Sequence, residues 1–306
     1  MLNSITQSSW RQYNTSLKQW HEFCVKCQWD PFAFSLEKVT EHLSTLFHEG
    51  KGYSMLNTTR SALSLLFPYF EGRSIGDHYI IKRLLKGFAK SKPPRPKYNA
   101  TWDPKSILTY IESLGECETW SLKTLSLNLV TMLALITAQR VQTLSLIKVS
   151  NLAMYESYAE ILIPDRIKTS GPTRVQPNLI IPKFESNPKC CVFEFLKLYL
   201  KCTENLRNKN NCDNLLISFQ KPHSKISSQT IGRWIKECMS LAGIDTEKFS
   251  AHSCRHAATS SALKNGVPVD IILARAGWTQ SSSTFATFYN RPVVDPTQFG
   301  TGVFAS

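Results

Sequence analysis

A basic segment broken by prolines divides this sequence after its first ninety residues. Between positions 82 and 102 the chain carries seven positive charges and no acidic residue, namely Lys82, Arg83, Lys86, Lys90, Lys92, Arg95 and Lys97. Pro93, Pro94 and Pro96 stop any helix here, because proline lacks an amide hydrogen and its ring clashes with the preceding turn. The break predicts two domains, 1–90 and 103–292, joined by a semi-rigid basic linker at 91–102 and followed by a tail at 293–306.

The first domain is predicted to be a small bundle of four helices. Apolar residues recur at steps of three and four in the segments 10–24, 36–47, 56–67 and 79–88. This spacing places them along one face of a helix, which packs on a core. Glycines punctuate the joints at Gly50, Gly52, Gly72 and Gly76.

The second domain is predicted to combine helices with a few strands. An apolar helix is expected over 125–147, and further helices over 192–207, 230–242, 256–265 and 269–276. Strand-like runs at 158–163 and 174–181, with prolines and a glycine around them, predict a β-hairpin or a small antiparallel sheet. The fold class is therefore mainly α, with a helical N-terminal domain and an α+β second domain of mostly helices.

The charge balance favours a polyanionic partner. The 306 residues include 36 Lys or Arg and 23 Asp or Glu, for a formal net charge of +13, which suits nucleic acid better than a membrane surface. Nine cysteines lie without a framework spacing, as is typical of reduced, intracellular thiols. No secretory signal and no membrane span are expected, since the most apolar run, 125–138, is shorter than the roughly 20 residues a bilayer requires.

The linker charges, with Lys90, Lys92, Arg95 and Lys97 at their centre, allow three interpretations. They form a solvated linker, they bind the phosphates of a DNA backbone without reading its sequence, or they serve as a nuclear import signal. The sequence leaves these interpretations open.

Three residues are candidates for gripping an anion. His252 and Arg255 are three apart at an expected helix start, so both face one ligand, and the helix N-terminus adds positive potential. The alternative is a helix cap and a surface ion pair. Arg140 lies between apolar turns, where an unpaired charge is costly. Its partner is either phosphate oxygens held in a bidentate grip or an acidic side chain.

Three further residues are candidates for the chemistry itself. Lys168, near the expected hairpin tip, can give a proton to a leaving oxygen, although exposed lysines are often merely solvated. Trp278 has one N–H donor, with a packed core aromatic as its alternative role. Tyr289 lies eleven residues further on and can act as a nucleophile toward a DNA phosphate.

The order and spacing of these six residues resemble the tyrosine recombinase, or phage-type integrase, family. The family pattern is His-x-x-Arg-His, a glycine, Gly-His or Gly-Trp, and then tyrosine. This chain matches it with His252–His256, Gly266, Gly277-Trp278 and Tyr289. The run Gln139–Leu144 and the Phe288-Tyr289 ending look most like the recombinases of DIRS- and Ngaro-type eukaryotic retrotransposons. The resemblance covers nearly the whole chain and implies a core-binding domain, a linker and a catalytic domain.

The resemblance implies a site-specific DNA recombinase that needs no metal, ATP or other cofactor. Tyr289 would attack a scissile phosphate to form a 3′-phosphotyrosyl link, which a second strand's 5′-hydroxyl would then attack. The two arginines would neutralise the transition state, and Trp278 would offer its N–H to a phosphate oxygen. His252 would act as an acid, a base or a further donor, and Lys168 would protonate the leaving 5′-oxygen.

The implied partners are double-stranded DNA and further copies of the chain. Recombinases of this family act as tetramers on two duplexes, so the tail at 293–306 is expected to dock on a neighbouring subunit. The expected task is integration or excision of a mobile element, and the expected location is the nucleus.

Some positions depart from the family pattern. Thr143 stands where the family usually has an acid that supports the first arginine, so a different neighbour must support Arg140. The gap of eleven from Trp278 to Tyr289 exceeds the commonest nine. Arg166 and Lys183 compete with Lys168 for the lysine's role in the same hairpin region.

The sequence also allows other functions. Much of this pattern is also compatible with three other kinds of protein. These are a catalytically dead DNA-binding protein of the same fold, a type IB topoisomerase and a nuclear scaffold protein. The spacing His21-x-x-Cys24-x-x-Cys27 is compatible with zinc, but a fourth ligand is missing. Core thiols on an amphipathic helix are the better interpretation, so no metal site is expected.

Overall fold

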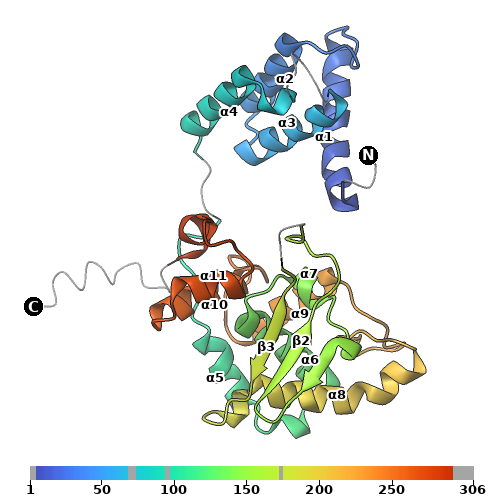
Figure 1. Ribbon diagram of the computed structural model, residues 1–306, viewed down its shortest axis with the longest axis vertical. Coiled ribbons are helices and arrows are strands. Elements are labelled where there is room, and N and C mark those ends of the chain that lie inside the picture. Colours follow the sequence, from blue (N-terminus) through green and yellow to red (C-terminus); the bar gives the residue numbers. More distant parts are fainter. Residues whose placement is uncertain (1–4, 68–73, 94–96, 172–174, 292–306) are drawn as a thin grey trace, which may run out of the picture. The chain divides into compact units, whose positions relative to one another are not determined.

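The computed structural model describes residues 5–67, 74–93, 97–171 and 175–291. The chain forms two compact units, Met1–Arg95 and Pro96–Ser306 (Figure 1). Each unit has its own hydrophobic core. Both are mainly helical and the second contains a small antiparallel sheet, which confirms the expected fold class. No helix in the described ranges is long and apolar enough to cross a membrane.

The helices of the first unit are α1 (Gln7–Lys26), α2 (Leu36–His48), α3 (Tyr53–Leu66) and α4 (Tyr79–Ser91). Those of the second unit are α5 (Lys105–Ser113), α6 (Leu122–Thr137), α7 (Val141–Leu144), α8 (Val192–Lys209), α9 (Ser228–Leu241), α10 (Ser253–Lys264) and α11 (Val269–Arg275). The strands are β1 (Leu152–Met154), β2 (Tyr158–Leu162) and β3 (Asn178–Pro182). Single 3-10 turns lie at Ile75–Asp77, Cys117–Thr119, Val149–Asn151 and Pro188–Cys190, and a π-helical turn, η6, at Phe285–Tyr289.

The four expected N-terminal helices are all present and enclose one core. Side chains cap the helices where the sequence allows it, as when the Ser35 hydroxyl accepts the amide of Lys38 at the start of α2. Trp20 of α1 is fully buried and donates its indole N–H to the carbonyl of Pro31 at 2.9 Å. The apolar faces of the helices therefore pack on this core, as their amphipathic spacing predicts, and the polar faces point to solvent.

The second unit is built around α6, which is buried on nearly every side and contacts α8, α9 and α10. The sheet has the order β1-β2-β3 and is antiparallel throughout, with Tyr158 opposite Pro182 and Leu162 opposite Asn178 (Figure 1). The two strand-like runs are thus confirmed as β2 and β3. Strand β1 was not expected, because it is only three residues long.

The expected continuous helix over 125–147 is wrong. Helix α6 ends at Thr137, Ala138 adopts a left-handed conformation with φ of 50°, and α7 begins only at Val141. A non-glycine residue pays a steric cost in that conformation, so tertiary contacts must hold it. The break turns Arg140 out of the helical path and leaves it in an extended conformation.

The boundary between the units falls inside the segment expected to be the linker, and part of that segment is folded. Tyr98 and Trp102 are both buried in the core of the second unit. The Trp102 indole donates to the hydroxyl of Ser253 at 2.8 Å, which ties this stretch to the first turn of α10. The composition of this segment predicts a linker, but burial of its two aromatic side chains in the core gives it a fixed structure.

His42 of α2 generates a prediction for the stability of the first unit. Its side chain is buried between Trp20 and Phe23, and neither ring nitrogen has a hydrogen-bond partner in the described structure. Burial disfavours the charged imidazole and lowers the pKa of His42 to about 4. Between pH 6.5 and about 4 the unfolded chain therefore binds a proton that the folded chain does not, and stability falls as the pH falls.

We expect thermal unfolding of the full chain to show this loss over that pH window. The variant His42→Leu, which removes no hydrogen bond, should have a flatter dependence of the unfolding midpoint on pH. His48→Leu, on the last turn of the same helix, is the matched control. An unchanged slope in the His42 variant would contradict the assignment.

Candidate active site

The start of α10 places two of the candidate residues together. His252 is the N-cap residue of this helix and Arg255 lies in its first turn. Arg255 is almost fully buried, at 1% exposed. Its guanidinium donates to the carbonyl of Ala138 at 2.9 Å and to the carbonyl of Ala276 at 2.5 Å. One arginine therefore joins the end of α6 to the end of α11.

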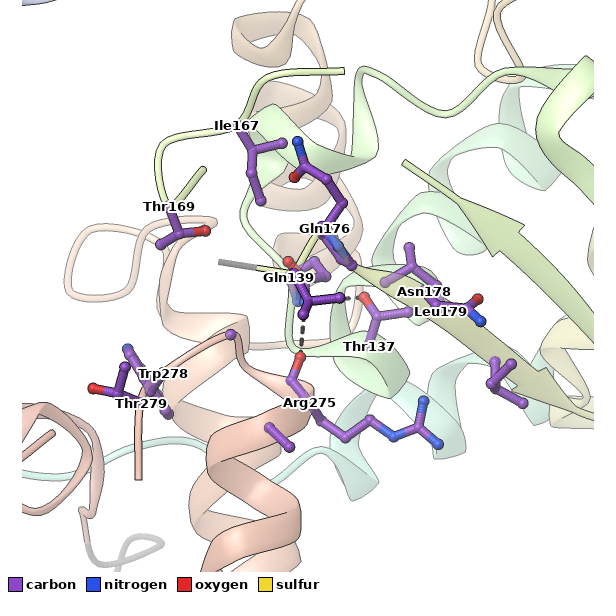
Figure 2. A pocket seen from close by; sticks show the side chains of 15 residues that line it. Thr137, Gln139, Ile167, Thr169, Gln176, Asn178, Leu179, Arg275, Trp278 and Thr279 are labelled. Carbon is purple, nitrogen blue, oxygen red and sulfur yellow. Dashed lines mark hydrogen bonds between the residues drawn. The ribbon is translucent and has the colours of Figure 1, made fainter. Parts of the chain in front are cut away.

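A second bond reinforces this junction. The amide nitrogen of the Gln139 side chain donates to the carbonyl of Arg275 at 2.7 Å, as the dashed line in Figure 2 shows. The backbone amide of Gln139 in turn donates to the hydroxyl of Thr137 at 3.3 Å. These contacts hold the corner that follows α6. Arg140 is the next residue of the chain after this corner, and it is half-buried.

Tyr289 lies against this cluster from the π-helical turn η6. Its hydroxyl is 2.7 Å from Nε2 of His252, a hydrogen-bond distance. The centroids of the Trp278 and Tyr289 rings are 4.6 Å apart. The guanidinium carbon of Arg255 lies 4.2 Å from the centre of the Trp278 ring and 5.4 Å from that of Tyr289. The structure thus brings four candidate residues into direct contact.

The charges of the site are positive and lack acidic partners. Within the described residues, none of the ion pairs involves Arg140, Lys168 or Arg255. Burial, followed by the neighbouring charge of Arg140, lowers the pKa of Arg255 to about 9. Tyr289 acts in the opposite direction and raises this pKa. The Nε of Arg255 is buried and has no hydrogen-bond partner in the described structure. Arg255 still carries its charge at neutral pH, so the site is suited to an anion.

His252 is neutral at physiological pH in this environment. It retains an exposed edge, yet the surrounding protein desolvates it, and the positive charges of Arg255, Arg140, Lys97 and Lys168 repel a proton. Together these effects lower the pKa of His252 to about 4. A neutral imidazole can accept a proton from the hydroxyl that it contacts.

The three cations of the hairpin region, Lys168, Lys183 and Arg166, differ in their surroundings. Lys168 is exposed on the connection 163–177 between β2 and β3, and its charge reaches His252. Lys183 follows β3 at the opposite end of the hairpin, where it pairs with Glu185 at 4.0 Å. Arg166 is also exposed on the connection, but it is not among the main charges that lower the pKa of His252. Lys168 remains the candidate.

A cavity of about 500 Å³ opens beside this cluster (Figure 2). Its wall includes the candidate residue Trp278 and the sequence neighbours of two others, Gln139 next to Arg140 and Thr169 next to Lys168. The cavity therefore lies next to the candidate site. Amide and hydroxyl groups of Thr137, Gln176, Asn178 and Thr279 make much of its lining polar.

The residues expected to bind a DNA backbone are divided between the two units. Lys90 lines a groove along α4 with Tyr79, Lys82, Arg83 and Lys86. Lys92 donates from Nζ to the carbonyl of Gly50 at 2.8 Å. Lys97 belongs to the second unit and adds its charge to the surroundings of His252. Arg95 and the tail at 293–306 lie outside the described residues.

His256 is a residue of the site that sequence reasoning missed. Its ring stacks on that of Tyr289, with centroids 4.1 Å apart and planes at 17°. It also meets Tyr98 edge to face at 5.2 Å. Burial, followed by the charges of the neighbouring His252 and Arg291, lowers its pKa to about 4. Its position four residues after His252, on the same helix face, was the available signal.

No group of three or more His, Cys, Asp or Glu side chains in the described ranges is arranged to hold a metal ion. This includes His21 and Cys24 of α1 and the residue that caps its end, Cys27. Cys24 is buried in the core of the first unit, and burial raises its pKa. The thiol is thus kept protonated, as for a packed core residue.

Comparison with known families decides the affiliation of the second unit. The sequence model of the Phage integrase family matches residues 105–293. The chain belongs to the Phage integrase family. The matched range contains all six candidate residues of the site, from Arg140 to Tyr289. A comparison with curated proteins finds no match.

Several solved structures share the fold over most of the chain. One is the XerH site-specific recombinase bound to its palindromic difH substrate in a post-cleavage complex. It has a TM-score of 0.66 and 18% identity, over 97% of this chain and 80% of that one. Another is a lambda integrase dimer bound to a COC′ core site, with a TM-score of 0.56 and 18% identity, over 94% and 72% of the two chains. A lambda integrase tetramer bound to a Holliday junction gives a TM-score of 0.57 and 15% identity, over 95% and 74%.

The bonds of Arg255 predict that lysine cannot replace it. Lysine keeps the charge, but its single ammonium group lacks the planar fork that reaches two carbonyls at once. Arg255→Lys should therefore leave a buried carbonyl unsatisfied and lower the free energy of unfolding by about 1–3 kcal/mol. Urea unfolding measures this loss. Arg166→Lys, at an exposed position, is the control, and equal stability of the two variants would contradict the bridging role.

Proposed function

We propose that this protein is a site-specific DNA recombinase in which Tyr289 is the nucleophile. The observation that carries the proposal is the hydrogen bond between the Tyr289 hydroxyl and a neutral His252. This pair lies beside two arginines that have no acidic partner in the described structure. A hydroxyl with a neighbouring base, next to unpaired positive charge, is the arrangement that attack on a phosphodiester requires.

The chemistry follows from these contacts. Tyr289 Oη gives its proton to Nε2 of His252 and forms a bond to the scissile phosphorus. The bond from phosphorus to the 5′-oxygen breaks, and Nζ of Lys168 supplies the proton that this oxygen takes up. Rejoining runs the same steps in reverse, with the 5′-hydroxyl of the incoming strand as nucleophile. The phosphotyrosyl link preserves the phosphodiester bond energy, so the exchange needs no ATP.

The arginines stabilise the state between cleavage and joining. The transition state carries extra negative charge on the non-bridging oxygens, and Arg140 and Arg255 are positioned to neutralise it. Loss of one such donor typically lowers the rate by about 10²–10³. Their mutual repulsion in the free protein is relieved when the phosphate arrives, so part of the binding energy appears only with DNA present.

The groove of α4 supports DNA binding by the first unit. Arg83, Lys86 and Lys90 follow one another at spacings of three and four residues, which places them on one face of the helix. Lys82 lines the same groove but pairs with Asp77 at 2.8 Å. The Tyr79 hydroxyl accepts a hydrogen bond from Arg83 at 3.1 Å, which orders part of this face. Such a row of charges fits the phosphates of a duplex, as the excess positive charge of the whole chain also suggests.

Strand exchange requires two duplexes and several protomers. We infer assembly on DNA, a dimer on each site and a tetramer on the junction, with the tail at 293–306 docking on a neighbour. The solved relatives support this inference, since one is a dimer on a core site and another a tetramer on a Holliday junction. By its likeness to the DIRS- and Ngaro-type recombinases, we infer a role in mobile-element integration or excision in the nucleus.

The covalent intermediate gives the direct test of the proposal. We expect the protein to become covalently joined to DNA when it is mixed with nicked, partly randomised duplexes in EDTA and then denatured in SDS. Tyr289→Phe should abolish this adduct and retain DNA binding, because only the attacking oxygen is lost. Tyr155→Phe, at an exposed tyrosine far along the chain, should form it normally. An adduct that survives in Tyr289→Phe would refute the assignment, and sequencing the trapped DNA would define the site.

The groove of α4 has its own test. Removing one phosphate contact with Arg83→Gln or Lys86→Gln should weaken binding to all DNA sequences alike. It should also reduce the slope of log affinity against log salt by about 1. The control is Lys18→Gln, an exposed lysine of α1. Slopes equal to that of the control would show that α4 does not contact phosphates.

A further inference from the structure

Tyr289 contacts a single helix at three points. On α10, His252, His256 and Ser260 are spaced by four residues and so lie along one face. His252 bonds the hydroxyl of Tyr289 and His256 stacks on its ring. Ser260 bonds the tyrosine's main chain. One helix therefore fixes the hydroxyl, the ring and the backbone of the same residue.

Of the three contacts, the one made by Ser260 holds the backbone near Tyr289 with two hydrogen bonds. The Oγ of Ser260 donates to the carbonyl of Tyr289 at 2.8 Å and accepts the amide of Arg291 at 3.1 Å. One hydroxyl can do both, because it has one donor and two acceptor positions. The side chain is only 4% exposed. The two bonds clamp the backbone on both sides of Asn290, directly after η6.

The turn η6 depends on such contacts for its position. It has five residues, Phe285–Tyr289, too few for a helical turn to be stable on its own. The carbonyls at its end have no partner within the turn, and the Ser260 hydroxyl satisfies the last of them. Phe285 anchors the other end in a small cluster with Ile272 and Leu273.

We propose that Ser260 is a positioning residue, whose two bonds hold Tyr289 at His252 and over Arg255 before DNA binds. This inference rests on the proposed function. Ser260 acts through the tyrosine's backbone and touches neither phosphate nor leaving group. A displacement of about 1 Å at a nucleophile can cost about 10²-fold in rate. The hydroxyl of Ser260 is therefore expected to control the cleavage rate without affecting the affinity for DNA.

The test compares Ser260→Ala with wild type on one nicked duplex recovered from the covalent adduct. We expect single-turnover adduct formation at saturating protein to be about 10- to 100-fold slower, with unchanged affinity for the same duplex. Ser261→Ala is the matched control, since this neighbouring serine makes no bond to Tyr289 in the described structure. Cleavage at the wild-type rate would overturn the proposal, and so would a loss of affinity as large as the loss of rate.

A second substrate separates tyrosine positioning from proton donation. In a duplex whose bridging 5′-oxygen is replaced by sulfur, the leaving group departs without a proton. Lys168→Ala should regain rate on this duplex, whereas Ser260→Ala should remain slow. Recovery of the rate in Ser260→Ala would overturn the proposal.

The proposed function and the positioning role of Ser260 would fail in different ways. If wild type forms no adduct, the proposed function fails, whereas a fast Ser260→Ala beside an active wild type refutes only the positioning role.

Discussion

The buried guanidinium of Arg255 is the contact on which the candidate site depends. It bonds the carbonyl of Ala138, 117 residues earlier in the chain, and that of Ala276, 21 residues later. Through these bonds one side chain fixes the corner that presents Arg140 and the loop that presents Trp278. The left-handed conformation of Ala138 is held in the same way, because its carbonyl is turned toward the arginine. Strain of this kind persists only where surrounding contacts over-determine it.

The positive charges of Arg255 and Arg140 repel each other, and a bound anion would reduce this repulsion. A structural arginine is usually paired with an acid, whereas Arg255 bonds to carbonyls and is repelled by the charge of a second arginine, Arg140. Such a site is costly to fold when empty and gains energy when a phosphate enters. Burial, followed by these positive charges, keeps His252 neutral, so that it is free to accept the tyrosine's proton.

Much of this molecule was predictable because its signals are local. Amphipathic spacing located the four helices of the first unit, and strand-like runs located β2 and β3. The prediction failed where tertiary contacts override local pattern. The apolar run after Leu125 predicted an unbroken helix, but the bonds to Arg255 and Arg275 hold a corner there. Tyr98 and Trp102 belonged by composition to a linker, but they are buried in the second unit's core.

The sequence by itself determined the chemical inventory: the residue types of the site, their order, the family, and the excess positive charge. These follow from local patterns and from spacing along the chain. Only the tertiary structure decided which groups meet. It brings Tyr289 to His252 from 37 residues away, adds His256 and Ser260 to the tyrosine's surroundings, and separates Lys168 from Lys183. The reason is that such contacts depend on how α10, η6 and the corner after α6 pack together, and no local signal in the chain encodes that packing.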